Sequence, residues 1–178
     1  MTLYKHLQVP HHKLISEKLY WYIKDCTPIL EEKQFWNDLS VEDVLIAVPE
    51  LKEYVDSQNL EIAQISAIYV EPNAGDNIHI DFNTDIRILW PVNNCEGSYT
   101  RFFDIDPKQV QIRRLPNGIW YKRISQKPPY TQLGELELTS PVLFNPGIAH
   151  AIFTNPTCSN PRLTVTIKFT TSIDYLLH

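Results

Sequence analysis

Two histidines of this chain, His79 and His150, lie within strand-like sequence, where the backbone can hold a side chain firmly enough for chemistry. The first belongs to the segment NIHIDF at residues 77–82, whose alternation places His79 and Asp81 on the same face. A neutral imidazole nitrogen and a carboxylate oxygen on a stiff strand are good ligands for a divalent metal. A His-x-Asp triplet alone arises by chance in roughly one such chain in three. A surface strand with two polar residues is therefore an open alternative.

A second candidate element follows His150 and a loop rich in asparagine and proline, and it is the strand-like segment 162–170. Its polar and apolar side chains alternate, so that one face carries Arg162, Thr164, Thr166 and Lys168. Such a face must meet either water or a polar cavity. The pattern fits a half-exposed antiparallel strand as well as a strand that lines a cavity.

Taken together, these residues follow an order that is typical of one enzyme family. His79-x-Asp81 is followed by His150 and then by Arg162-x-Thr164. The order and spacing resemble the His-x-Asp...His...Arg-x-Ser/Thr signature of the Fe(II)- and 2-oxoglutarate-dependent oxygenases, and the resemblance covers roughly residues 60–170. The segment 90–100 is also similar to short, uncharacterised members from bacteriophage and marine bacterial genomes, which suggests a phage-encoded protein.

The resemblance implies a function and a role for each matching residue. His79, Asp81 and His150 would form the two-histidine, one-carboxylate triad that holds Fe(II) and leaves positions open for 2-oxoglutarate and O2. Arg162 would bind the distal carboxylate of 2-oxoglutarate through two parallel hydrogen bonds, and Thr164 would add a hydroxyl. The expected reaction is hydroxylation of a substrate that the sequence does not identify, with release of succinate and CO2.

Two further residues are candidates for this site. Tyr69 lies on the preceding strand and faces the same side as Ile65 and Ala67; relatives often use a tyrosine hereabouts to bind the co-substrate. An ordinary core tyrosine is an equally open interpretation. Arg87 is a charge among apolar residues, and we interpret it as the partner of a nearby carboxylate rather than as a contact for substrate or co-substrate.

The segment 107–132 contains six positive charges and no acidic residue, although the whole chain has a net charge of -5. Its cations are interleaved with Trp120, Tyr121 and Tyr130, and they are Lys108, Arg113, Arg114, Lys122, Arg123 and Lys127. One hypothesis is a lip that binds an anionic substrate or a nucleic acid. The alternative is a hairpin whose charges only keep it soluble. The acidic balance argues against a protein whose whole surface binds nucleic acid.

The elements that position these residues divide the chain at about residue 60. Apolar spacing predicts a helix around residues 14–23 that ends before Pro28, a second helix after Ser40 and a restart at Pro49. Short β-branched and aromatic runs then predict strands at 61–70, 77–82, 87–92, 98–104, 110–114, 119–124, 135–138, 142–144, 150–153 and 162–170, with a hairpin turn at 116–118.

This pattern predicts a mainly β fold with N-terminal helices, and the family resemblance specifies a double-stranded β-helix, a cupin-like jelly-roll barrel. We expect residues 1–178 to form a single domain, in which residues 1–59 are a helical support and residues 60–178 the barrel core.

The chain shows no sign of secretion. Its N-terminus is interrupted by Pro10, charges and histidines before any apolar run develops, so we expect neither a signal peptide nor a membrane anchor. Cys26, Cys95 and Cys158 are widely spaced and odd in number, and we interpret them as free thiols of an intracellular, cytoplasmic protein.

A rival hypothesis is a catalytically inactive, cupin-like binding or structural protein, and a metal-using cupin of other chemistry comes third. Arg162 discriminates among them, because only an oxygenase that uses 2-oxoglutarate needs a cation for the distal carboxylate. The sequence carries no signature of oligomeric state.

Overall fold

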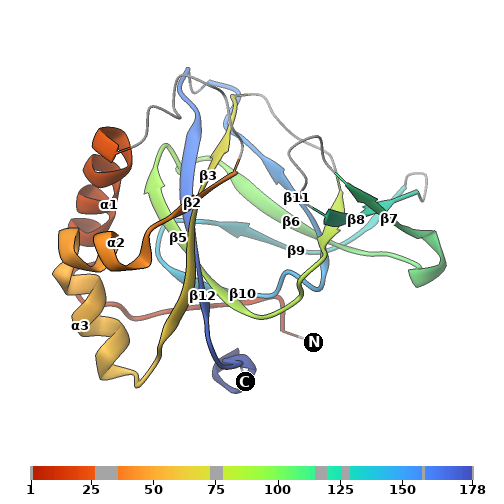
Figure 1. Cartoon of the computed structure of the whole chain (residues 1–178). Helices are drawn as coiled ribbons and strands as arrows, with labels where there is room; N and C mark the ends of the chain where they lie inside the picture. Colours follow the sequence, from red (N-terminus) through yellow and green to blue (C-terminus); the bar gives the residue numbers. More distant parts are fainter. Residues whose placement is uncertain are drawn as a thin grey trace.

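The computed structural model describes residues 2–26, 36–72, 78–114, 120–125, 129–157 and 159–177. Two antiparallel six-stranded sheets face each other, and the N-terminal helices cover the outer face of one of them (Figure 1). This is a mainly β jelly-roll sandwich, and it confirms the predicted fold class.

The first sheet has the order β1-β10-β5-β12-β3-β2, and the second has the order β7-β8-β4-β11-β6-β9. The strands of the first sheet are β1 (Tyr4–His6), β2 (Trp36–Leu39), β3 (Ile62–Val70), β5 (Arg87–Asn93), β10 (Val142–Phe144) and β12 (Arg162–Phe169). Those of the second are β4 (His79–Asp81), β6 (Tyr99–Asp104), β7 (Val110–Arg114), β8 (Trp120–Ile124), β9 (Thr131–Glu137) and β11 (Ala149–Phe153). The helices are α1 (His12–Cys26), α2 (Val41–Ala47) and α3 (Pro49–Ser57), with short 3-10 turns at Pro107–Gln109 and Asp174–Leu177.

The helices form where the sequence predicts them. Ser40 caps α2, because its hydroxyl accepts a hydrogen bond from the backbone N–H of Asp43 at 3.3 Å. Pro49 begins α3, a position where its missing N–H costs nothing. None of the helices among the described residues is long and apolar enough to cross a membrane.

The helix layer packs on the first sheet through an apolar core. Ile15, Leu19 and Ile23 of α1 are almost fully buried against a cluster that includes Trp90 of β5 and Val165 of β12. Each such aliphatic side chain contributes about 1.5–3 kcal/mol when fully buried. Ser16 fixes the helix further: its hydroxyl donates to the carbonyl of Pro91 at 2.6 Å and accepts from the Trp90 indole at 3.0 Å. The helix layer therefore shields the outer face of the first sheet from solvent.

The space between the two sheets contains buried polar side chains as well as apolar ones. Its apolar part is a cluster that includes Leu89 from the first sheet and Phe102 and Leu136 from the second. Next to Leu89 in the register lies Thr166 of β12, and Arg162, Thr164 and Thr166 are each at most 4% exposed. The polar face of β12 thus lines the interior, and its interpretation as a half-exposed strand is wrong because both faces of the first sheet are covered.

The helical expectation for residues 1–59 needs one correction, because this part of the chain also contributes two strands. β1 pairs with β10, and β2 pairs with β3, at opposite edges of the first sheet. Asp38 anchors β2: its Oδ1 accepts hydrogen bonds from Ser66 at 2.6 Å and from Gln64 at 2.7 Å, both on β3. Strands this short depend on their partners rather than on their own propensity.

The remaining predicted strands are present, with small shifts at their ends. β9 begins at Thr131 rather than at residue 135, and its register with β6 shifts between Phe102 and Phe103. Pro28, the hairpin turn at 116–118, Lys127 and Cys158 lie outside the described residues.

Candidate metal centre

The predicted metal ligands come together on the inner face of the second sheet. β4 and β11 are antiparallel neighbours in which His79 stands directly opposite His150, and Asp81 follows two residues along β4. Cross-strand partners point to the same face of a sheet. Ile80, which lies between His79 and Asp81, packs on the outer side with Ala149 and Ala151, as the alternation predicts.

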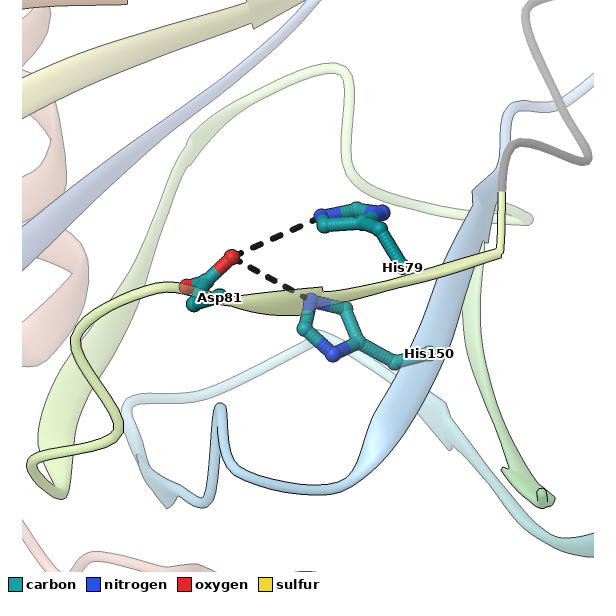
Figure 2. Close-up of side chains that lie close together, drawn as sticks. All are labelled: His79, Asp81 and His150. Atoms are coloured by element: carbon teal, nitrogen blue, oxygen red, sulfur yellow. Dashed lines mark ion pairs between the residues drawn. The ribbon is translucent and has the colours of Figure 1, made fainter. Parts of the chain in front are cut away.

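The three side chains converge on a small volume (Figure 2). One potential ligand atom from each of His79, Asp81 and His150 lies within 4.8 Å of the others. Oδ1 of Asp81 is 3.5 Å from Nε2 of His79 and 4.0 Å from Nε2 of His150. Both imidazoles therefore turn a nitrogen toward the same carboxylate oxygen.

His150 is held in the form that a metal requires. Its Nδ1 donates a hydrogen bond to the carbonyl oxygen of Ile148 at 2.8 Å, which leaves the lone pair on Nε2 facing Asp81. Phe144 contacts the ring edge-on, with centroids 5.0 Å apart. Burial, and secondarily the nearby His79, lowers the pKa of His150 to about 4, so the imidazole is neutral at pH 7.

Asp81 is ionised and oriented. Burial alone would raise its pKa, but the hydrogen bond from His79, the charge that His150 acquires when it is protonated below about pH 4, and the charge of Arg87 hold the pKa at about 2. Arg87 lies on β5 and is 2% exposed; its Nη1 is 3.3 Å from Oδ2 of Asp81. The predicted ion pair of Arg87 is thus confirmed. Because Arg87 faces Oδ2, the other oxygen is left for the histidines.

Arg87 is itself fixed by the backbone. Its Nη2 donates to the carbonyl of Asn83 at 2.7 Å, and its Nε donates to the carbonyl of Asp85 at 3.4 Å. A buried cation with these partners is a rigid support for the carboxylate. Both carbonyls belong to the loop between β4 and β5, so this loop fixes the arginine that supports the carboxylate of β4.

The donor set fits a divalent transition metal such as Fe(II). Two neutral imidazoles and one carboxylate on one side of a site are the ligands that Fe(II) takes in facial triads. Ligands at about 2.1 Å from a metal on neighbouring octahedral positions lie about 3 Å apart. The separations of 3.5 and 4.0 Å, and the 4.8 Å within which all three atoms lie, exceed this value. The side chains would therefore have to draw together by about 0.5–2 Å to complete the coordination.

Arg162 faces the same intersheet space from the first sheet, and no carboxylate of residues 2–26, 36–72, 78–114, 120–125, 129–157 or 159–177 forms an ion pair with it. None of its three guanidinium nitrogens has a hydrogen-bond partner within the described part of the chain. Burial lowers the pKa of the Arg162 guanidinium. The nearby Cys95 thiol opposes this shift, but a thiol is only a weak hydrogen-bond acceptor. An uncompensated buried charge costs several kcal/mol. This arrangement indicates a site for an anion.

Three threonine residues lie in the same interior. Thr164, next to Arg162 on the polar face of β12, is 2% exposed. The hydroxyls of Thr166 on β12 and of Thr100 on β6 have no hydrogen-bond partner among the described residues. Sequence reasoning missed Thr100, although its alternation with Phe102 could have placed it on the inner face.

Tyr69 is not brought together with these residues. It stands opposite Leu163 on β12 and packs in the cluster beneath the helices, on the face away from Arg162 and Thr164. Burial raises its pKa to about 12. The predicted co-substrate role has no support in this placement, because strand alternation puts the Tyr69 side chain outside the intersheet space.

We compared the chain with family models, curated proteins and solved structures. No family model and no curated protein matches the chain. A Pseudomonas putida prolyl-4-hydroxylase structure is similar with a TM-score of 0.44 and 15% identity, over 95% of this chain and 88% of that one. The E. coli ycfD structure is similar with a TM-score of 0.39 and 17% identity, over 72% of this chain and 30% of that one.

Proposed function

We propose that the protein is an Fe(II)- and 2-oxoglutarate-dependent dioxygenase that hydroxylates its substrate. The observation that carries the proposal is the buried, uncompensated guanidinium of Arg162, which faces the same intersheet space as His79, Asp81 and His150. A metal triad alone would suit many reactions. A triad together with an unpaired buried cation suits a metal enzyme whose co-substrate carries a second negative group.

Each side chain has a role in this reaction. His79, Asp81 and His150 would hold the iron, and Arg87 would keep Asp81 ionised and oriented. Bound Fe(II), with 2-oxoglutarate and O2, supplies the oxidising chemistry: one oxygen atom enters the substrate, and 2-oxoglutarate becomes succinate and CO2.

Arg162 and Thr164 would bind the co-substrate. The guanidinium would donate two parallel hydrogen bonds to the distal carboxylate, which also compensates its buried charge. The Thr164 hydroxyl lies on the same face of β12 and would add a further hydrogen bond. Phe102 and Phe144 beside His150 would limit the access of water to the metal.

The rival hypothesis, a cupin-like binding protein without turnover, leaves Arg162 unexplained. A structural role for this residue would require a strong protein acceptor, and the described residues offer its guanidinium only the weakly accepting thiol of Cys95. We further propose that residues 1–178 act as one domain, in which the helix layer of residues 1–59 supports the first sheet and thus β12.

The test is formation of succinate from 2-oxoglutarate under air with added Fe(II). We expect slow, substrate-independent turnover by the wild-type protein and its loss in His79→Ala and Arg162→Gln. Tyr69→Phe is the matched control, because its side chain lies on the far face of the same sheet. Unchanged turnover in either site variant, with the fold verified by circular dichroism, would contradict the proposal.

A further inference from the structure

The hairpin β7–β8 extends the inner face of the second sheet beyond the metal ligands. β8 pairs with β4, so that Arg123 stands directly opposite His79. β7 pairs with β8, so that Gln111 stands opposite Arg123 and Arg113 opposite Tyr121, which in turn stands opposite Asp81. Figure 1 shows this hairpin on the side of the molecule away from the helices.

This register places two arginines on the face that carries the metal ligands. Adjacent strands are about 4.8 Å apart, and cross-strand partners share a face. The Cα atom of Arg123 is therefore one strand away from that of His79, and Arg113 is two strands away from Asp81. Arg113 and Gln111 indeed meet on one face, since Nη2 of Arg113 donates to Oε1 of Gln111 at 2.7 Å.

The positive charge of these two arginines is available to a ligand. Both side chains are exposed, and no ion pair connects either of them to a carboxylate in the described ranges. Asp104 projects from β6 on the same face, but β6 is three strands away from β8. The part of the inner face nearest the metal ligands is thus cationic.

The other cations of the hairpin point elsewhere. The Cζ atom of Arg114 lies over the ring of Trp120, 5.4 Å from the ring centroid. The ring centroids of Trp120 and Phe82 are 6.3 Å apart. Lys122 stands opposite Ile80, which packs on the outer side of the second sheet. The structure therefore divides the cations of the β7–β8 hairpin between two faces, of which the inner one adjoins the metal centre.

We propose that Arg113 and Arg123 form an anion-binding subsite of the active site, and that the substrate carries a phosphate or carboxylate group near the carbon that is oxidised. The inference rests on the proposed function. A planar guanidinium suits both anions, because it donates two parallel hydrogen bonds to their oxygens. The register places the strands of Arg123 and Arg113 about 5 and 10 Å from the strand that carries His79 and Asp81. This spacing fits a substrate whose anionic end lies a few bonds from its reacting carbon.

The experiment uses phenyl phosphate and phenylacetate as probes of the full chain. Calorimetry on the metal-free protein gives their dissociation constants for wild type, for Arg113→Gln/Arg123→Gln and for Arg114→Gln/Lys122→Gln. The last variant is the matched control, because it removes the same charge from the outer face of the same hairpin. We expect the inner-face variant to weaken binding about tenfold to hundredfold and the control to change it by less than about twofold.

A second readout locates the anion. With Mn(II) and 2-oxoglutarate bound, the paramagnetic relaxation of the phenyl phosphate phosphorus reports its distance from the metal, and we expect roughly 5–10 Å. Equal losses in both double variants, or a phosphorus coordinated directly to Mn(II), would overturn the proposal. So would binding of a short oligothymidylate that depends on Arg114 and Trp120 but not on the inner arginines. Failure of Mn(II) to bind would refute the proposed function, while the calorimetric comparison would still decide on the arginines.

Discussion

Arg87 connects the residues that bind the metal to those that support them. Its guanidinium is almost completely buried, contacts Oδ2 of Asp81 and is fixed by the carbonyls of Asn83 and Asp85. The carboxylate is therefore ionised and oriented before any metal arrives. Such outer partners determine metal affinity nearly as much as the ligands do.

We predict that Arg87→Gln lowers Mn(II) affinity about tenfold to hundredfold, because Asp81 loses its partner and its orientation. Electron paramagnetic resonance of a Mn(II) titration measures the change. Arg101→Gln is the control, since Arg101 forms a surface pair with Glu135 at 2.6 Å and does not contact the triad. Because a buried arginine also stabilises the fold, Arg87→Lys is the second variant. Its Mn(II) affinity should lie between that of the wild type and that of Arg87→Gln. Full affinity in a folded Arg87→Gln protein would disprove the supporting role.

Single residues also show what alternation can and cannot predict. The sequence indicated that His79 shares a face with Asp81 and Arg162 with Thr164, and both predictions are confirmed. It also indicated that Tyr69 shares a face with Ile65 and Ala67, which is correct. Both faces of the first sheet are covered, however, and the period of two does not tell which of them borders the site. For this reason the sequence left both interpretations of Tyr69 open, and the structure places its side chain in the cluster beneath the helices.

Among the elements, β12 is the strand that connects the core to the site. Leu163, Val165 and Ile167 pack beneath the helices, while Arg162 and Thr164 line the space between the sheets. The sequence predicted both faces of this strand, yet it left open whether the polar one meets water. The opposing sheet decides this point. β1 and β2 were missed for a related reason: each is short, and each is stabilised by pairing with a strand distant in sequence.

The helix layer is predicted to contribute stability rather than chemistry. Ser40→Ala removes the cap of α2 and should lower the free energy of unfolding by about 1 kcal/mol, without changing Mn(II) affinity. Urea unfolding measures the first effect, and the Mn(II) titration measures the second. Ser57→Ala serves as the control, because its exposed hydroxyl caps no helix N-terminus: it donates to the carbonyl of Tyr54 and accepts from the side chain of Gln58 at the end of α3. A variant that keeps its stability but loses the metal would contradict this division of roles.

On the scale of the whole molecule, the two sheets bring together residues that are far apart in the chain. The second sheet supplies the metal ligands and the arginines of the β7–β8 hairpin, and the first sheet supplies Arg162 and Arg87. The predicted elements were sufficient to indicate the fold class. The position of the hairpin beside β4 was not predictable, because it depends on the pairing of β4 with β8.

In the proposed site, His79, Asp81 and His150 bind Fe(II), and Arg162 binds the distal carboxylate of the 2-oxoglutarate that chelates this iron. An anaerobic titration of the metal-free protein with Fe(II) and 2-oxoglutarate tests it most directly, by following the weak visible charge-transfer band of the iron chelate. We predict a band that requires both additions, that weakens strongly in Arg162→Gln and that is unchanged in Tyr69→Phe. A folded protein that retains iron but develops no band, or a band indifferent to Arg162→Gln, would contradict the account.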